Sequence, residues 1–201
     1  MKTLVISLLC ALALLGSILA EEPLRDGDII FHTSKSSQSL VIQRATGSTY
    51  SHMGIIIFEN GNPFVLEAIE PVSLTPLSKW VNRGAGGRYS VKRLKDAERL
   101  LKPEKVAKMK KIGYAFLGKH YDSYFEWSDS RQYCSELIYK IYERSIGIKL
   151  CPLRRLRSFD LDDPIVKKKL KERYGRHVPL DELVVAPSDI YDSPYLVTVP
   201  K

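Results

Sequence analysis

The chain has 201 residues, of which 44% are hydrophobic and 27% are charged. These proportions are typical of a folded globular protein, and they exclude a fibrous or intrinsically disordered chain. The formal net charge is +8. No recognisable nucleic-acid-binding motif accompanies this charge, so we expect no nucleic-acid partner.

The first twenty residues resemble an export signal. Lys2 precedes an apolar run over residues 4–15, and small residues up to Ala20 follow it. This order predicts a signal peptide over residues 1–20, cleaved after Ala20, and therefore an exported protein, periplasmic or secreted. An uncleaved anchor is the alternative, but the run is shorter than the ~20 apolar residues that span a bilayer. We expect no membrane span in the rest of the chain.

Residues 21–201 are expected to form a single domain, because no internal repeat or low-complexity tract divides them. Loss of Lys2 with the signal peptide lowers the net charge from +8 to about +7. Basic residues gather over residues 92–111 and 149–176. The ordinary interpretation is a solvated helix face. The alternative is attraction to an anionic surface formed by envelope polymers or lipid headgroups.

Two cysteines follow the signal peptide, Cys134 and Cys151. In an oxidising compartment an even pair favours a disulfide. A helix of about four turns is predicted between them, however, and its ends lie ~20 Å apart. A disulfide requires Cα atoms within ~7 Å of each other. We therefore expect both thiols to be free.

The N-terminal half is predicted to be mainly β structure. Residues 52–58 are almost all apolar, as expected for a strand that is buried on both faces. Asn60-Gly61-Asn62-Pro63 then forms a hairpin-type turn. Strands are predicted at residues 28–32, 52–58, 64–69, 72–74 and 89–94, with a helix at 36–46.

The C-terminal half is predicted to be mainly helical, with helices at residues 104–117, 131–145 and 159–174. The clearest is 131–145, whose apolar residues share one face. Residues 128–130 are candidate N-caps for it, and Gly147 ends it. A last strand at 195–199 is expected to join the sheet. Helices and an antiparallel sheet in one domain make an α+β fold.

Cys134 is the candidate nucleophile. It is predicted to lie in the first turn of the helix at 131–145, where free backbone N–H groups and the helix dipole favour a thiolate. The same N–H groups would serve as donors to an oxyanion. The alternative is a buried, inert cysteine, because position 134 shares a face with Leu137, Ile138 and Ile141.

His52 and Glu67 are candidate partners for this nucleophile. His52 begins an apolar strand, and Glu67 is the one acidic residue in the apolar return strand. A carboxylate in such a run needs a partner. Both residues lie at comparable distances from the turn at 60–63, so cross-strand contact is expected. Glu67 would orient the imidazole in a Cys-His-Glu triad.

Other residues offer weaker alternatives. His32, His120 and His177 are isolated in predicted loops or strand ends, and no two metal-type ligands have a tight spacing. We therefore expect no metal and no cofactor. Ser135 lacks the G-x-S-x-G turn that would make it a nucleophile.

A loop at residues 119–129, the aromatic loop, leads into the predicted nucleophile helix. Phe125 lies in this loop, and Tyr133 directly precedes Cys134; we expect both to contribute to substrate binding. Tyr124, Phe125 and Trp127 would suit an acyl chain. The alternative is that these aromatic side chains pack in the core.

Several segments together resemble a known family. They are Leu24-Arg-Asp-Gly-Asp-Ile-Ile-Phe, Ser51-His-Met-Gly-Ile, Val65-Leu-Glu-Ala, Gly118-Lys-His-Tyr-Asp and Tyr133-Cys-Ser-Glu-Leu. In content and order they are similar to the YiiX/YebB-like proteins, a circularly permuted branch of the NlpC-type papain-like cysteine hydrolases. The resemblance spans residues 24–199. Here, as in that branch, the histidine precedes the cysteine.

The resemblance implies a permuted papain-like core with Cys134, His52 and Glu67 as catalytic residues, and it places Tyr121 in the site. It implies a thiol hydrolase, an amidase or peptidase that cleaves an amide or ester bond. The implied substrate is an envelope peptide or a lipidated molecule. An acyltransferase or lipid deacylase that uses the same thioester remains open. A catalytically silent binding module is disfavoured, because a binder has no need of all three residues.

Overall fold

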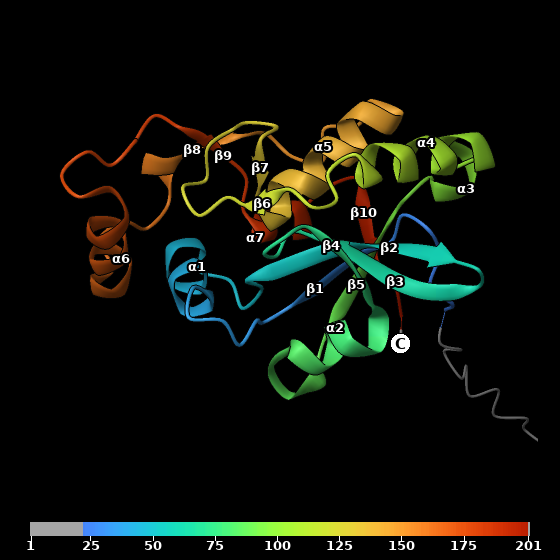
Figure 1. Ribbon diagram of the computed structural model, residues 1–201, viewed down its shortest axis with the longest axis horizontal. Coiled ribbons are helices and arrows are strands. Elements are labelled where there is room, and N and C mark those ends of the chain that lie inside the picture. Colours follow the sequence, from blue (N-terminus) through green and yellow to red (C-terminus); the bar gives the residue numbers. More distant parts are fainter. Residues whose placement is uncertain (1–21, 201) are drawn as a thin grey trace, which may run out of the picture.

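Figure 1 shows the computed structural model, which describes residues 22–200. The predicted signal peptide lies outside this range. The centre of the molecule is a six-stranded antiparallel sheet in the order β10-β5-β1-β2-β3-β4. Its strands are β1 (Ile29–His32), β2 (His52–Glu59), β3 (Asn62–Glu67), β4 (Ser73–Pro76), β5 (Ser90–Leu94) and β10 (Leu196–Thr198).

The strands agree with the alternation and turns read from the sequence. β2 is the long apolar strand, and its inner residues are buried on both faces of the sheet. The hairpin to β3 turns at Asn60 and Gly61, which both have positive φ, at 49° and 78°. The short strand β10 pairs with β5, as expected for the C-terminal residues.

Helices cover both faces of the sheet (Figure 1). On one face lie α4 (Pro103–Tyr114) and α5 (Cys134–Ile146), and on the other α2 (Leu77–Arg83). The larger core packs β2 residues such as Ile55 against Leu137 and Ile141 of α5. The smaller core surrounds Trp80 of α2, which is fully buried. The fold is therefore α+β, with the six-stranded sheet packed between helices on its two faces.

Helix α5 begins later than the sequence suggested. Residues 128–130 are not its N-caps, because the chain continues as β7 (Arg131–Gln132), which pairs in parallel with β6 (His120–Tyr121). Tyr133 is the N-cap, and Cys134 is the first helical residue. The helix ends at Gly147, whose φ of 77° suits a glycine.

At one side of the molecule, α1 (Ser39–Thr46) packs on α6 (Pro164–Tyr174) (Figure 1). Asp163 caps α6 through the N–H groups of Ile165 and Val166. The other short elements are η1 (Ala85–Gly87), α3 (Ala97–Leu100), β8 (Arg154–Arg155), η2 (Leu156–Ser158), β9 (Leu183–Val184) and α7 (Pro187–Tyr191). Among residues 22–200, no helix combines the length and apolar character needed to cross a bilayer.

Candidate active site

His52 and Glu67 meet on one face of the β2–β3 hairpin. Nε2 of His52 donates to Oε2 of Glu67 at 2.7 Å. Gly54 lies two residues after His52 on β2, and the close approach of β3 at this point depends on its lack of a side chain. A Cβ at position 54 would come within 2.3 Å of Val65 and 3.4 Å of the Cβ of Glu67. The cross-strand contact expected from the turn is thus present.

Glu67 is fully buried and held by three side chains. Besides His52, Thr75 of β4 donates to Oε1 at 2.6 Å, and Arg83 of α2 forms an ion pair with the same oxygen. Burial alone would raise the pKa of Glu67, but the hydrogen bond with His52 and the other contacts outweigh it and lower the pKa. The carboxylate is therefore ionised and fixed toward the imidazole.

Cys134 approaches the imidazole from the start of α5. The thiol is 3% exposed and lies close enough to His52 to help raise the pKa of the imidazole. Because Nε2 is engaged by Glu67, Nδ1 is the ring nitrogen left for the thiol. Burial alone would lower the pKa of His52, but the hydrogen bonds to Cys134 and Glu67 raise it to about 9. Thiol, imidazole and carboxylate therefore form one connected chain.

A buried ion pair fixes the start of α5. Glu136 accepts hydrogen bonds from the N–H groups of Tyr133 and Ser128, at 3.4 and 3.2 Å. Its carboxylate also pairs with Lys140 at 2.7 Å. Burial raises the pKa of Glu136 to about 7, although Lys140 opposes this rise. The aromatic loop and the first turn of α5 are thus tied together.

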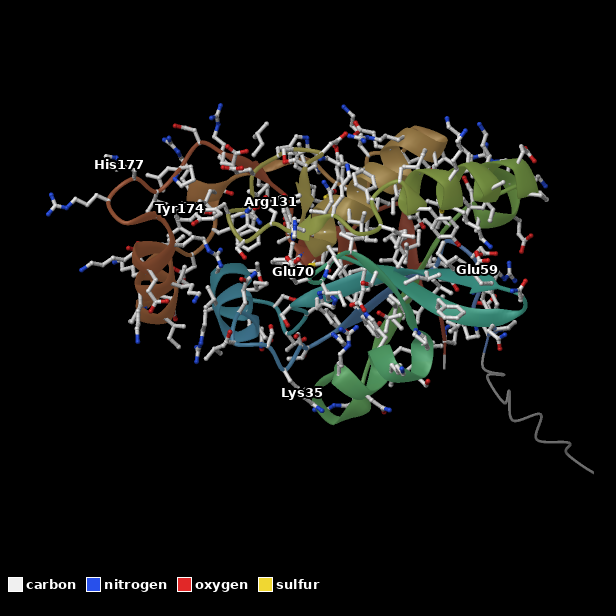
Figure 2. All side chains as sticks on the ribbon, viewed as in Figure 1. Lys35, Glu59, Glu70, Arg131, Tyr174 and His177 are labelled. Atoms are coloured by element: carbon white, nitrogen blue, oxygen red, sulfur yellow. The ribbon has the colours of Figure 1, made fainter. Side chains whose placement is uncertain are left out.

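The remaining candidate nucleophile and histidines do not form a second centre. Ser135 donates its hydroxyl hydrogen bond to the carbonyl oxygen of Val185 at 2.7 Å, which directs it into the core. His120 pairs with Glu70 at 2.7 Å and is 74% exposed. His177 lies beyond α6, at one end of the molecule, whereas Glu70 lies near the middle (Figure 2).

His32 belongs to the site, although the sequence alone did not identify it as a site residue. It lies opposite His52 in the β1–β2 pairing, with ring centroids 5.4 Å apart, and it stacks on Trp80 at 3.9 Å. Burial, followed by the nearby charge of His52, lowers the pKa of His32 to about 3. It is therefore an uncharged imidazole that packs beside His52. Its position beside His52 follows from the register of β1 against β2, and the sequence does not specify that register at this end of the strands.

An apolar pocket opens at Cys134. Its walls come from α1, α6, the aromatic loop and the segment at 184–187, and its volume with the open mouth is about 730 Å³. Tyr121, Phe125 and Tyr133 all line it, as expected for substrate-contacting residues. Other apolar lining side chains are Val41, Ile42, Ala45, Leu156, Phe159, Leu161, Val166 and Leu170, and the cationic Lys169 and Arg173 of α6 line the pocket as well.

The aromatic loop contributes unequally to this pocket. Phe125 has a φ of 57°, which non-glycine residues rarely adopt, and its ring packs edge-on against Tyr133 at 5.2 Å. Tyr124 is 44% exposed and packs on Tyr174 of α6, while Trp127 packs on Tyr139. Of the three loop aromatics weighed for an acyl chain, Phe125 is therefore the one in the pocket.

A second cavity opens on the other side of the site, at His52. Most of its lining side chains are polar, including Ser34, Lys35, Gln38 and Arg83. Tyr121 and Ile42 line both cavities and so stand between them. The hydroxyl of Tyr121 accepts a hydrogen bond from Gln38 at 3.1 Å.

Comparison with known proteins agrees with this geometry. Residues 23–200 match the model of the permuted papain-like amidase family of YaeF and YiiX, the C92 family. The chain belongs to this family. It is 46% identical over 175 residues to a protein of Escherichia coli K12 named uncharacterized protein YiiX, covering 87% of this chain and 85% of that protein.

A solved structure is also similar. The crystal structure of "metalloprotein yiiX" from Escherichia coli O157:H7 superposes with a TM-score of 0.84 and 46% identity, over 88% of this chain and 97% of that one. The fold is therefore permuted papain-like, and the family makes this chain a cysteine hydrolase.

The word metalloprotein describes the E. coli structure. Over residues 22–200 of this chain, no three His, Cys, Asp or Glu side chains are grouped where they would hold one metal ion. Both oxygens of Glu67 already accept hydrogen bonds from His52, Thr75 and Arg83. The donor set at the site does not fit a metal centre, so the chemistry is derived from the side chains alone.

Proposed function

We propose that Cys134, His52 and Glu67 form the catalytic triad of a hydrolase that cleaves an amide or ester bond in an acylated substrate. The thiol gives its proton to His52, and Sγ attacks the carbonyl carbon to form a C–S bond. Backbone N–H groups in the first turn of α5 stabilise the oxyanion. The imidazolium then protonates the leaving amine or alcohol as its bond to carbon breaks, and water hydrolyses the thioester.

The role of Glu67 in this scheme is orientation. It holds the ring with Nδ1 toward Cys134 and stabilises the imidazolium, whose pKa is raised to about 9. Thr75 and Arg83 keep the carboxylate in place. The carboxylate does not itself transfer the proton.

The observation that carries the acyl part of the proposal is the apolar pocket that opens at Cys134. Aliphatic and aromatic side chains surround the position where the acyl carbon would lie on sulfur. A hydrophobic chain gains free energy in such a site, whereas a muropeptide would leave its polar groups unpaired there. The lipidated substrate is therefore favoured over the envelope peptide. A lipid deacylase and a thioester-forming acyltransferase share this chemistry and differ in whether water or another nucleophile accepts the acyl group.

A narrowed pocket tests this assignment. Ala45 of α1 lines the pocket, and Ala45→Trp would fill it. We expect kcat/KM for N-dodecanoylglycine to fall at least about tenfold, because overpacking excludes the chain. Hydrolysis of N-acetylglycine should change much less. Ala107→Trp, at an exposed position on α4, is the matched control. A muropeptide cleaved faster than N-dodecanoylglycine, at a rate insensitive to Ala45→Trp, would favour the peptide substrate instead.

The cellular setting is part of the same proposal. The apolar leader at residues 1–20 supports export to the periplasm or beyond. Lys168 and Lys171 of α6 are exposed and have no acidic partner among residues 22–200, so α6 offers positive charge near the pocket for an anionic surface. Reversing both charges should weaken binding to phosphatidylglycerol vesicles more than reversing Lys105 and Lys108 of α4. Equal losses of vesicle binding for the two pairs of substitutions would show that α6 has no special role in binding the surface.

A further inference from the structure

Two cavities of different character meet at the reacting groups. The apolar pocket contacts Cys134, and the polar cavity contacts His52. Ile42 and Tyr121 line both, so the cavities adjoin at the thiol–imidazole pair. A substrate that spans this point would place one half in each cavity.

The chemistry of a thiol hydrolase fixes which half enters which cavity. The acyl half becomes bonded to Sγ and remains beside Cys134 until water releases it. The leaving half receives a proton from the imidazolium, so it must lie within hydrogen-bonding reach of His52. The acyl group therefore occupies the apolar pocket, and the leaving group occupies the polar cavity.

The charges in the polar cavity indicate what the leaving group carries. The ammonium group of Lys35 donates to the carbonyl oxygen of Asn82 at 3.2 Å, and no carboxylate pairs with it among residues 22–200. The guanidinium of Arg83 is held by Glu67 on one side and is 42% exposed. Glu70 also lines the cavity, and its carboxylate accepts hydrogen bonds from His120 and from the N–H of Tyr121. Of the two cations that line the cavity, Lys35 is therefore the one without a paired carboxylate among residues 22–200.

We propose that the polar cavity is a leaving-group subsite that selects an anionic group, a carboxylate or a phosphate, close to the scissile bond, with Lys35 as its specificity-determining residue. The substrate is then an apolar acyl chain joined through an amide or ester to a small anionic head. This inference rests on the proposed hydrolase function and adds the identity of the leaving group.

Matched substrate pairs test the subsite. N-dodecanoylglycine and N-dodecanoylglycinamide differ only in the carboxylate, and 1-dodecanoylglycerol 3-phosphate and 1-dodecanoylglycerol differ only in the phosphate. We expect the anionic member of at least one pair to have the higher kcat/KM. Preference within the first pair alone identifies a carboxylate head, and preference within the second alone identifies a phosphate head.

Lys35→Gln should lower that preference by roughly threefold to fivefold, as expected for one partly exposed charge pair. High salt should reduce the preference of the unmodified protein in the same direction. Lys79→Gln is the control, because Lys79 is exposed on α2 and does not line the cavity. Equal kcat/KM within both pairs, or a preference unchanged by Lys35→Gln, would overturn the anionic subsite.

The orientation is tested separately by reversing the polarity of the substrate. N-acetylglycine dodecylamide carries its apolar chain on the leaving side and should be cleaved poorly at the dodecylamide bond. Faster cleavage of this compound than of N-dodecanoylglycine would overturn the assignment of the two cavities. Each of these outcomes still includes a thioester at Cys134. If no thioester formed with any of the substrates, that result would instead contradict the proposed function itself.

Discussion

Cys134 begins helix α5 and Cys151 follows the other end of that helix. The two cysteines have similar burial but different surroundings. Their exposed fractions are 3% and 7%, and both sulfurs are free, which confirms the expectation of no disulfide. Cys134 is the first residue of α5 and interacts with the imidazole of His52. Burial, followed by the carboxylate of Asp189, raises the pKa of Cys151 to about 12.

The difference shows that accessibility is a poor guide to which buried thiol is reactive. What distinguishes Cys134 is a helix N-terminus, a basic ring nitrogen and an adjoining pocket, whereas Cys151 has an apolar environment and a nearby acid.

Replacing each cysteine by alanine should give the largest difference. Cys134→Ala removes the nucleophile, so release of dodecanoate from N-dodecanoylglycine should fall by about 10³-fold or more. Cys151→Ala should retain near-normal turnover and lose roughly 1–2 kcal/mol in the free energy of unfolding, since it leaves a small cavity. Steady-state kinetics and urea unfolding measure the two effects. Comparable loss of turnover in both variants would show that Cys134 has no special role.

Glu67→Gln should have the next largest effect on turnover. The amide cannot stabilise the imidazolium, so kcat should fall by roughly 10- to 100-fold, which is less than for Cys134→Ala. Glu98→Gln, at an exposed surface position, is the control. Circular dichroism should show a folded protein in both. Full activity of Glu67→Gln would mean that the orienting residue lies elsewhere.

The pH dependence of the same variant provides an independent measurement. The folded-state pKa of His52, about 9, lies above its ordinary value of 6.5, so the imidazolium that protonates the leaving group is present below about pH 9. Activity should therefore decline as the pH rises through about 9. Glu67→Gln removes one of the interactions that raise this pKa, so its alkaline limb should move to lower pH. An unchanged alkaline limb would show that Glu67 does not affect the pKa of His52.

Alkylation should show the smallest but most direct contrast between the two thiols. Near neutral pH, iodoacetamide should modify Cys134 at least about tenfold faster than Cys151, because the raised pKa keeps Cys151 in its unreactive thiol form. Peptide mass analysis after short exposure reports both rates. Equal rates would remove the distinction in reactivity.

Local patterns were sufficient to predict the strands and helices that present Cys134, His52 and Glu67. The apolar run of β2, the turn at 60–63 and the amphipathic residues of α5 each have a short-range physical cause. The N-cap of α5 was predicted incorrectly, because β6–β7 pairing extends residues 131–132 before the helix begins. That pairing joins segments about ten residues apart and leaves no local trace.

Two further features of the site could not be predicted from local sequence patterns. The seven-residue helix α2, which supplies Arg83 and Trp80, is too short to give a clear period and starts after Pro76. The apolar pocket combines α1, α6 and residues 184–187 around Cys134, and such a combination depends on tertiary packing. The aromatic loop suggested an apolar site, but only Phe125 of its three candidates lines the pocket.

The most direct test of the triad is intact-mass analysis of the protein after a brief reaction with N-dodecanoylglycine that is then rapidly quenched. We expect a dodecanoyl adduct in thioester linkage that maps to Cys134, is released by neutral hydroxylamine and is absent from Cys134→Ala. His52→Ala should form the adduct far more slowly. An adduct that maps to another residue, or turnover that persists in Cys134→Ala, would contradict the assignment of Cys134 as the nucleophile.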